Sequence, residues 1–297
     1  MAHVMRAAAA VIILAASAVG QTTFEFHSGF WVNLHQFLMH EAVAKEPAPG
    51  DEAWRDAVDY YRREMVKRSV FDRDVKLMEL RFSEAGAEPP EGLDAAHTAV
   101  LAKVAAIYRK NWWTKHDQAN RKWIAAAEAL LAKYGANVRK DIARAYQVDW
   151  PAKPIRTDVA SYAGENGGYT TVDPSLITIN STEPSYQGMG TLEMLFHEAS
   201  HTIDEKVSDA LDAELKARGR LFRRRAFNHA ILFYTAGETV RKYVPDYVPF
   251  GERYGIFANG WPGSLPVLEK DWKPYLDGKI GLEEAVKAVV EDYGVAR

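Results

Sequence analysis

The sequence predicts a mainly α-helical protein with a small β-sheet, which is an α+β fold. Three observations predict this class: helical periodicity runs almost unbroken over residues 30–144, short β-prone stretches occupy residues 155–180, and helical periodicity returns after Gly190. At about 100–200 residues per domain, the 297 residues allow one large domain or two small ones. We expect a helical subdomain over residues 21–150 and a second unit over residues 151–297.

The N-terminal half is predicted to form four to six helices. One of them, over residues 54–66, has apolar side chains at three- and four-residue steps: Trp54, Ala57, Val58, Tyr61 and Met65. Proline and glycine predict turns at residues 46–50 and 86–92, and Gly135 predicts a third. Three histidines in this half stand in polar surroundings and are expected at the surface: His27, His97 and His116.

The second half is predicted to begin with a sheet and to continue as helices. The segment Ser175–Asn180 alternates apolar and polar side chains, which is typical of a strand with one buried face. Two further β-prone stretches precede it, Ile155–Tyr162 and Tyr169–Val172. The expected helices are Thr191–Val207, Asp209–Arg218, Ala226–Val244 and Leu282–Tyr293, with a loop over Pro245–Pro274.

The composition is that of a globular protein and excludes several classes of function. Hydrophobic residues make up 47% of the chain and charged residues 26%, so disorder is excluded as the main state. The formal net charge of −3 gives no electrostatic basis for a nucleic-acid partner. The absence of cysteine excludes disulfides, cysteine nucleophiles and Cys-ligated metals, which leaves His, Asp and Glu to bind a metal.

Residues 1–20 have the pattern of a secretory signal peptide. Arg6 precedes an apolar run from Ala7 to Val19, and small residues follow. The run of 13 residues is shorter than the roughly 20 that cross a bilayer as a helix. We therefore expect a cleaved leader and a periplasmic or secreted mature protein that does not associate with a membrane.

An H-E-x-x-H pattern, from His197 through Glu198 to His201, lies within a helical period. Residues four apart lie on one face of a helix, about 6 Å apart along its axis, so two imidazoles can converge on one metal ion. Neutral imidazoles bind Zn²⁺ and leave a coordination position open to water, and Glu198 lies beside that position as a general base. The alternative is a solvated helix face, which the apolar flanking residues argue against.

On this motif the segment from about Ser175 to Tyr247 resembles the zincins, the zinc metallopeptidases with H-E-x-x-H. The resemblance implies hydrolysis of peptide bonds in a zincin-like core, with His197 and His201 as zinc ligands. It implies that Glu198 removes a proton from water and later delivers it to the leaving amine. In zincins an edge strand binds the substrate as an added β-strand, and Leu176–Asn180 occurs where that strand is expected.

The third zinc ligand is predicted to be Glu238. Val207 stands where the metzincin extension requires histidine, which removes that type. Glu238 is the only charge between Arg225 and Arg241, and a carboxylate in so apolar a run needs a partner or a metal. A downstream helical glutamate resembles the gluzincin branch, although 36 residues separate His201 from Glu238 and Gly237 replaces the usual asparagine.

Other residues compete with Glu238 for the role of third ligand. Asp204 and Glu205 lie one turn beyond His201, where they are better placed to orient a ligand histidine. His229 lies nine residues before Glu238, half a turn round one helix, so the two cannot both face the same ion. The donor to the developing oxyanion stays open among five residues: Tyr234, Tyr243, Tyr247, Tyr254 and His229.

The sequence thus predicts an exported zinc-dependent peptidase that acts on peptide or protein substrates. Two alternatives stay open. The same site could hydrolyse a non-peptide amide or ester, or the chain could be a non-catalytic binding or scaffold protein with a vestigial zinc site. Structural zinc sites usually have four protein ligands, and here only three candidates are convincing. Substrate preference, internal or terminal cleavage and oligomeric state are left open.

Overall fold

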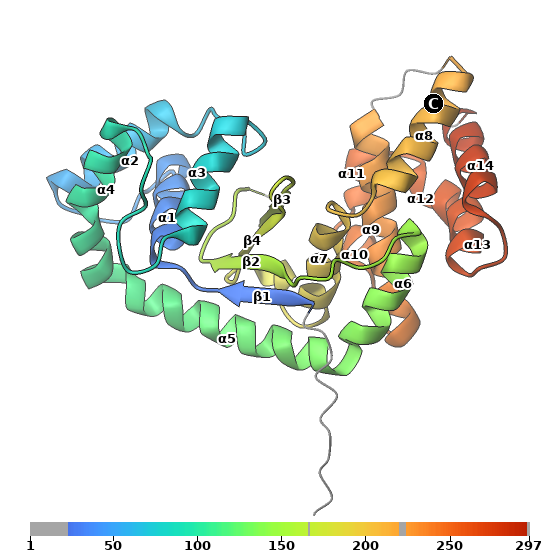
Figure 1. Cartoon of the computed structure of the whole chain (residues 1–297), viewed down its shortest axis with the longest axis horizontal. Coiled ribbons are helices and arrows are strands. Elements are labelled where there is room, and N and C mark those ends of the chain that lie inside the picture. Colours follow the sequence, from blue (N-terminus) through green and yellow to red (C-terminus); the bar gives the residue numbers. More distant parts are fainter. Residues whose placement is uncertain (1–22, 166, 220–223, 296–297) are drawn as a thin grey trace, which may run out of the picture.

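A computed structural model describes residues 23–165, 167–219 and 224–295, and the predicted signal peptide lies outside these ranges. The predicted fold class is confirmed: helices predominate and enclose one four-stranded mixed sheet. Helices α1 to α4 lie on one side of the sheet and the helices from α7 onward on the other, while α5 runs beneath the sheet (Figure 1). No helix in the described ranges is both long and apolar enough to span a membrane.

The N-terminal half forms six α-helices, as predicted. They are α1 (Phe30–Val43), α2 (Glu52–Glu64), α3 (Arg73–Glu84), α4 (Ala95–Tyr108), α5 (Thr114–Leu130) and α6 (Ala136–Tyr146). The predicted turns at residues 46–50 and 86–92 are confirmed as non-helical segments. The predicted turn at Gly135 is wrong, because this glycine lies in a π-helical turn (Leu131–Gly135) that joins α5 to α6 without a break.

The sheet has the strand order β1-β2-β4-β3. Its strands are β1 (Phe24–His27), β2 (Ile155–Ala160), β3 (Gly168–Thr171) and β4 (Leu176–Asn180). The three predicted strands are confirmed, and β1 is added from the other half of the chain. β1 and β4 both pair with β2 in parallel, whereas β3 pairs with β4 antiparallel. β3 is therefore an edge strand.

β4 is buried along its whole length, contrary to the prediction of one buried face. It lies between β2 and β3, and helices cover both faces of the sheet, so its polar residues are enclosed as well. Thr178 is 0% exposed and Asn180 is 8% exposed. The alternation of apolar and polar residues in Leu176–Asn180 thus marks a strand but not a solvated face.

The C-terminal half packs its helices around α7. They are α7 (Met189–Ser200), α8 (Glu205–Ala217), α9 (Arg224–Tyr243), α10 (Phe250–Arg253), α11 (Ile256–Gly260), α12 (Ser264–Val267), α13 (Lys273–Leu276) and α14 (Leu282–Val295). The loop predicted over residues 245–274 is wrong, because short helices fill most of it. Gly255 and Pro262 follow the ends of α10 and α11, whereas α12 continues through a π-helical turn (Leu268–Trp272) into α13. Most of the aromatic side chains of this segment pack into the core.

Two clusters of buried apolar side chains form the core. One lies among α1 to α4 and includes Trp54, Tyr61 and Phe82. The larger cluster lies between the sheet and α7 to α14, and it also includes Trp123 of α5 and Ile142 of α6. The division between the clusters therefore falls near the start of α5 and does not coincide with residue 150, because α5, α6 and β1 pack with the C-terminal half.

Candidate metal centre

Helix α7 carries the H-E-x-x-H motif through the centre of the protein. Every residue from Gly190 to Ser200 is buried, because the sheet and α9 pack against the helix. The predicted helix over residues 191–207 is shorter in the structure: it ends at Ser200, and His201 caps it with helical backbone angles. His197 and His201 keep the four-residue spacing, and their ring centroids are 5.1 Å apart.

Helix α9 brings a third histidine to this pair. The ligand atoms of His197, His201 and His229 all lie within 4.8 Å of one another. The Nε2 atoms of His197 and His229 are 3.0 Å apart, and the ring centroids of His201 and His229 are 5.0 Å apart. Three imidazoles with nitrogens this close could hold a metal ion, and three histidines with an open position form a catalytic type of zinc site.

Aromatic rings surround the three histidines. The ring of Phe233 stacks on His197 with centroids 3.9 Å apart, and the ring of Trp261 meets His229 edge-on at 5.5 Å. His197 is 1% exposed. This packing restrains the ring planes of His197 and His229, while His201 and His229 stay partly exposed.

The surroundings favour the neutral form of all three imidazoles. Burial lowers the pKa of His201 to about 4, and burial together with the nearby His201 lowers the pKa of His229 to about 4. The pKa of His197 is held well below its usual value by burial and by both other histidines. Because a metal ion binds only the neutral imidazole, the site is ready for a cation at neutral pH.

Glu198 points from α7 toward the edge strand β3. Burial raises the pKa of its carboxyl group to about 7, and a hydrogen bond from Thr170 partly opposes this rise. The Thr170 hydroxyl lies 2.6 Å from Glu198 Oε2 and 3.0 Å from the backbone oxygen of Glu198. A carboxyl group with a pKa near neutrality can both accept and return a proton at physiological pH.

The structure differs from the sequence prediction at the third ligand, because it brings His229 and not Glu238 to the histidine pair. The Glu238 carboxylate forms ion pairs with Arg241 and with Lys273, and the Lys273 Nζ lies 3.1 Å from Glu238 Oε2. This buried carboxylate therefore has the partners that a charge in an apolar run requires, and they are two cations. His229 and Glu238 lie nine residues apart on α9, on opposite sides of the helix, and only His229 faces the H-E-x-x-H motif.

Asp204 and Glu205 begin α8 and do not join the histidine group. Asp204 accepts hydrogen bonds from Asn228 and Ser208, and its charge raises the pKa of the neighbouring His229. Neither hydrogen-bond partner is a ligand histidine, so the expected role of Asp204 in orienting one stays a prediction. Glu205 is exposed.

The tyrosines considered as oxyanion donors have different surroundings. Tyr243 donates to Asp141 and Tyr247 donates to Glu193, so both hydroxyls serve buried or half-buried carboxylates. Tyr234 is 2% exposed. Tyr254 is 44% exposed and its ring lies 4.7 Å from that of Phe250. Of these four, Tyr254 is the most exposed.

Comparisons with known protein families, with curated proteins and with solved structures find no match. The interpretation of the site thus depends on its geometry. In the described part of the chain, His197, His201 and His229 are the one group of three or more such residues that could hold a metal ion. Sequence reasoning ranked His229 below Glu238, since a neutral histidine beside Asn228 in an apolar run is a weaker signal than an isolated charge.

Proposed function

We propose that this protein is an exported zinc-dependent peptidase that binds zinc through His197, His201 and His229. The observation that carries the proposal is the position of Glu198, which is buried directly after a ligand histidine and is held by a hydrogen bond from Thr170 of the edge strand. A purely structural site has no use for such a carboxyl group. The donor set supports zinc, since neutral imidazoles suit it, although imidazole also binds other divalent transition metals.

The residues of the chain have separate tasks in hydrolysis. A zinc ion at the three imidazoles would supply a Lewis acid that polarises the substrate carbonyl and the attacking water. Glu198 accepts the proton that the water loses as it attacks, holds it, and delivers it to the nitrogen of the leaving amine. Thr170 holds one oxygen of Glu198 by a hydrogen bond of 2.6 Å, which leaves the other oxygen for the proton.

The edge strand β3 supports a peptide as the substrate. The backbone N–H of Asn180 donates to the carbonyl of Gly167. The register of β3 and β4 then places the backbone N–H and C=O groups of Tyr169 and Thr171 toward β4 as well. Because bonding alternates along an antiparallel pair, Gly168 and Thr170 direct their N–H and C=O groups to the free edge. An extended peptide could pair there, next to Glu198. The sequence assigned this role to Leu176–Asn180, but that strand is internal.

The proposal is tested with purified mature protein, loaded with zinc and incubated with a library of peptides of defined sequence. We expect cleavage that depends on zinc, is lost in His229→Ala together with the metal, and is lost in Glu198→Gln with the metal retained. Cleavage by the Glu198→Gln variant at the wild-type rate would refute the mechanism. Zinc binding with cleavage of amide or ester substrates but of no peptide would favour the non-peptide hydrolase.

A further inference from the structure

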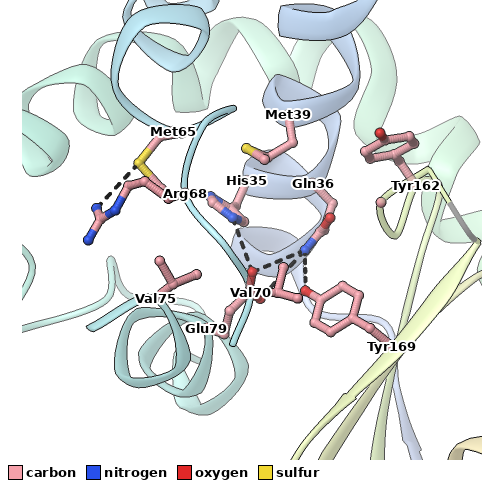
Figure 2. A pocket seen from close by; sticks show the side chains of 11 residues that line it. His35, Gln36, Met39, Met65, Arg68, Val70, Val75, Glu79, Tyr162 and Tyr169 are labelled. Carbon is pink, nitrogen blue, oxygen red and sulfur yellow. Dashed lines mark hydrogen bonds and ion pairs between the residues drawn. The ribbon is translucent and has the colours of Figure 1, made fainter. Parts of the chain in front are cut away.

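A cavity lies on the face of β3 opposite to Glu198, between this strand and the helical half. Its walls are apolar or aromatic and come from four parts of the chain: Met39, Met65, Val70, Val75, Tyr162 and Tyr169 (Figure 2). The space that the centre of a water molecule can reach inside the cavity is about 30 Å³. This is room for a few non-hydrogen atoms, such as those of one side chain, and not for a protein surface.

The polar groups at the base of the cavity are bonded to one another. Gln36 donates to the hydroxyl of Tyr169 at 2.7 Å and lies 3.4 Å from Glu79 Oε1. His35 Nε2 lies 3.3 Å from the same Glu79 oxygen (Figure 2). Gln36, His35 and Glu79 are all at most 3% exposed. Arg68 also lines the cavity, and its guanidinium forms an ion pair with Asp74. Because these polar groups already have partners, the apolar wall is the surface that meets an incoming side chain, and an apolar side chain fits it better than a charged one.

The position of Tyr169 connects this cavity to the proposed reaction. Successive side chains of a strand point to opposite faces of the sheet. Thr170 meets Glu198 on one face, and Tyr169 lines the cavity on the other. The side chains of a peptide paired with the free edge of β3 alternate between the two faces in the same way. The peptide residue opposite Tyr169 would have its Cα about 4.5 Å from the Cα of Tyr169. Its side chain would lie on the face of the cavity.

We propose that this cavity is a specificity pocket that binds an aliphatic side chain, of the size of leucine or methionine, one or two residues from the scissile bond. The inference depends on the proposed peptidase function and names its substrate class. It assigns to the helical half a role in substrate selection, since Met39, Met65, Val70 and Val75 all come from that half.

The test compares cleavage of a peptide library by zinc-loaded wild type and two cavity variants. Val70→Phe fills the cavity from a half-buried position, and Met39→Ala enlarges it. Wild type should prefer leucine or methionine over glycine at one position near the cleaved bond by about tenfold or more. Val70→Phe should remove that preference and leave glycine peptides unaffected, whereas Met39→Ala should move the preference to larger side chains.

Val43→Phe is the matched control, because Val43 is 42% exposed on the same helical half and does not line the cavity. Its cleavage profile should equal that of wild type. If wild type cleaves peptides and both folded cavity variants keep its profile, the specificity pocket is refuted and the peptidase function stands. If wild type prefers a charged residue at every position, the pocket is refuted as well. If zinc-loaded wild type cleaves no peptide, both proposals fail together.

Discussion

Two groups of buried histidines lie in this protein in different surroundings. In the helical half, His35 and His97 both hydrogen-bond to the hydroxyl of Tyr61, at 3.0 and 2.9 Å, and His35 also pairs with Glu79. In the candidate metal centre, His197 and His229 have their Nε2 atoms 3.0 Å from each other. The first group is bonded to hydroxyl and carboxylate partners, while the second directs ring nitrogens at one another.

The difference shows how burial alone fails to identify a metal site. A neutral imidazole has one N–H and one lone pair, and a hydroxyl satisfies either of them. Two imidazole nitrogens that face each other can share only one proton, and a third close by adds another lone pair. A cation satisfies all three lone pairs at once. The partners of a buried histidine, more than its depth, therefore indicate its role.

The largest effect is expected on zinc affinity, which substitutions in the second histidine group should lower and those in the first should not. His197→Ala or His229→Ala removes a ligand and should weaken zinc binding by more than about 100-fold, which exceeds the usual effect of a residue that only supports a ligand. His97→Asn removes an imidazole of equal burial from the helical half and should leave one zinc per chain. Elemental analysis and chelator competition measure both, and equal zinc affinity in His229→Ala and wild type would contradict the assignment.

The next largest effect concerns turnover without loss of metal. Glu198→Gln retains the size and the hydrogen bond from Thr170 but cannot accept a proton, so the rate of peptide cleavage should fall by about 10²–10⁴. Zinc content should not change. Glu41→Gln is the matched variant in the helical half, where the same substitution at a carboxyl group that is 3% exposed and lies outside the cavity should change the rate by much less. A similar loss in both variants would mean that the effect is structural.

A smaller effect is expected from pH in the metal-free protein. Burial lowers the pKa of His97 and of His229 to about 4, below the usual value of 6.5, so the unfolded chain binds more protons than the folded one between these values. The contribution of these two histidines to the free energy of unfolding is therefore fully present above about pH 6.5 and is lost as the pH drops toward 4. The slope is up to about 1.4 kcal/mol per pH unit for each histidine.

Denaturant unfolding at several pH values measures this slope. His97→Asn and His229→Asn should each reduce it by a similar amount, because burial is the largest cause of the lowered pKa of both groups. With zinc present, the contribution of His229 should increase, since protons then compete with the metal, while that of His97 stays the same. A slope that neither substitution changes would show that other groups govern the acid response.

Local periodicity predicted much of the fold and two of the three histidines. The four-residue spacing of His197 and His201 is a property of any helix, so the sequence alone determines that they share a face. β2, β3 and β4 were predicted from β-prone stretches between turn residues. β1 was missed because its four residues, Phe24–His27, are too few for a period and pair with a strand more than 120 residues away.

Features that depend on distant partners were not predicted correctly. His97 was expected at the surface because its neighbours in the sequence are polar, but it is 1% exposed and bonds to Tyr61 of another helix. The surroundings of Glu238 depend on a distant partner in the same way, since Lys273 pairs with it from 35 residues away. Which residue completes a site depends on how helices pack, and the periodicity of one helix contains no information about that.

The smallest effect is expected on the free energy of unfolding when Glu238 loses its charge. Glu238 is 8% exposed and pairs with Arg241 and Lys273, and these cations have second partners in Glu252 and Asp277. Because the cations keep those partners and stay partly exposed, Glu238→Gln should lower the free energy of unfolding by only about 1 kcal/mol. Thermal or denaturant unfolding measures this loss.

The zinc content of the Glu238→Gln protein shows whether Glu238 only stabilises the fold or also binds the metal. Glu252→Gln, which removes the other partner of Arg241, is the control and should have a similarly small effect. Both variants should bind one zinc per chain with the affinity of wild type, since His229 occupies the third position. Loss of zinc from a stably folded Glu238→Gln protein, with zinc retained by His229→Ala, would instead mean that the metal-bound protein recruits the carboxylate and that α9 turns or breaks when the ion binds.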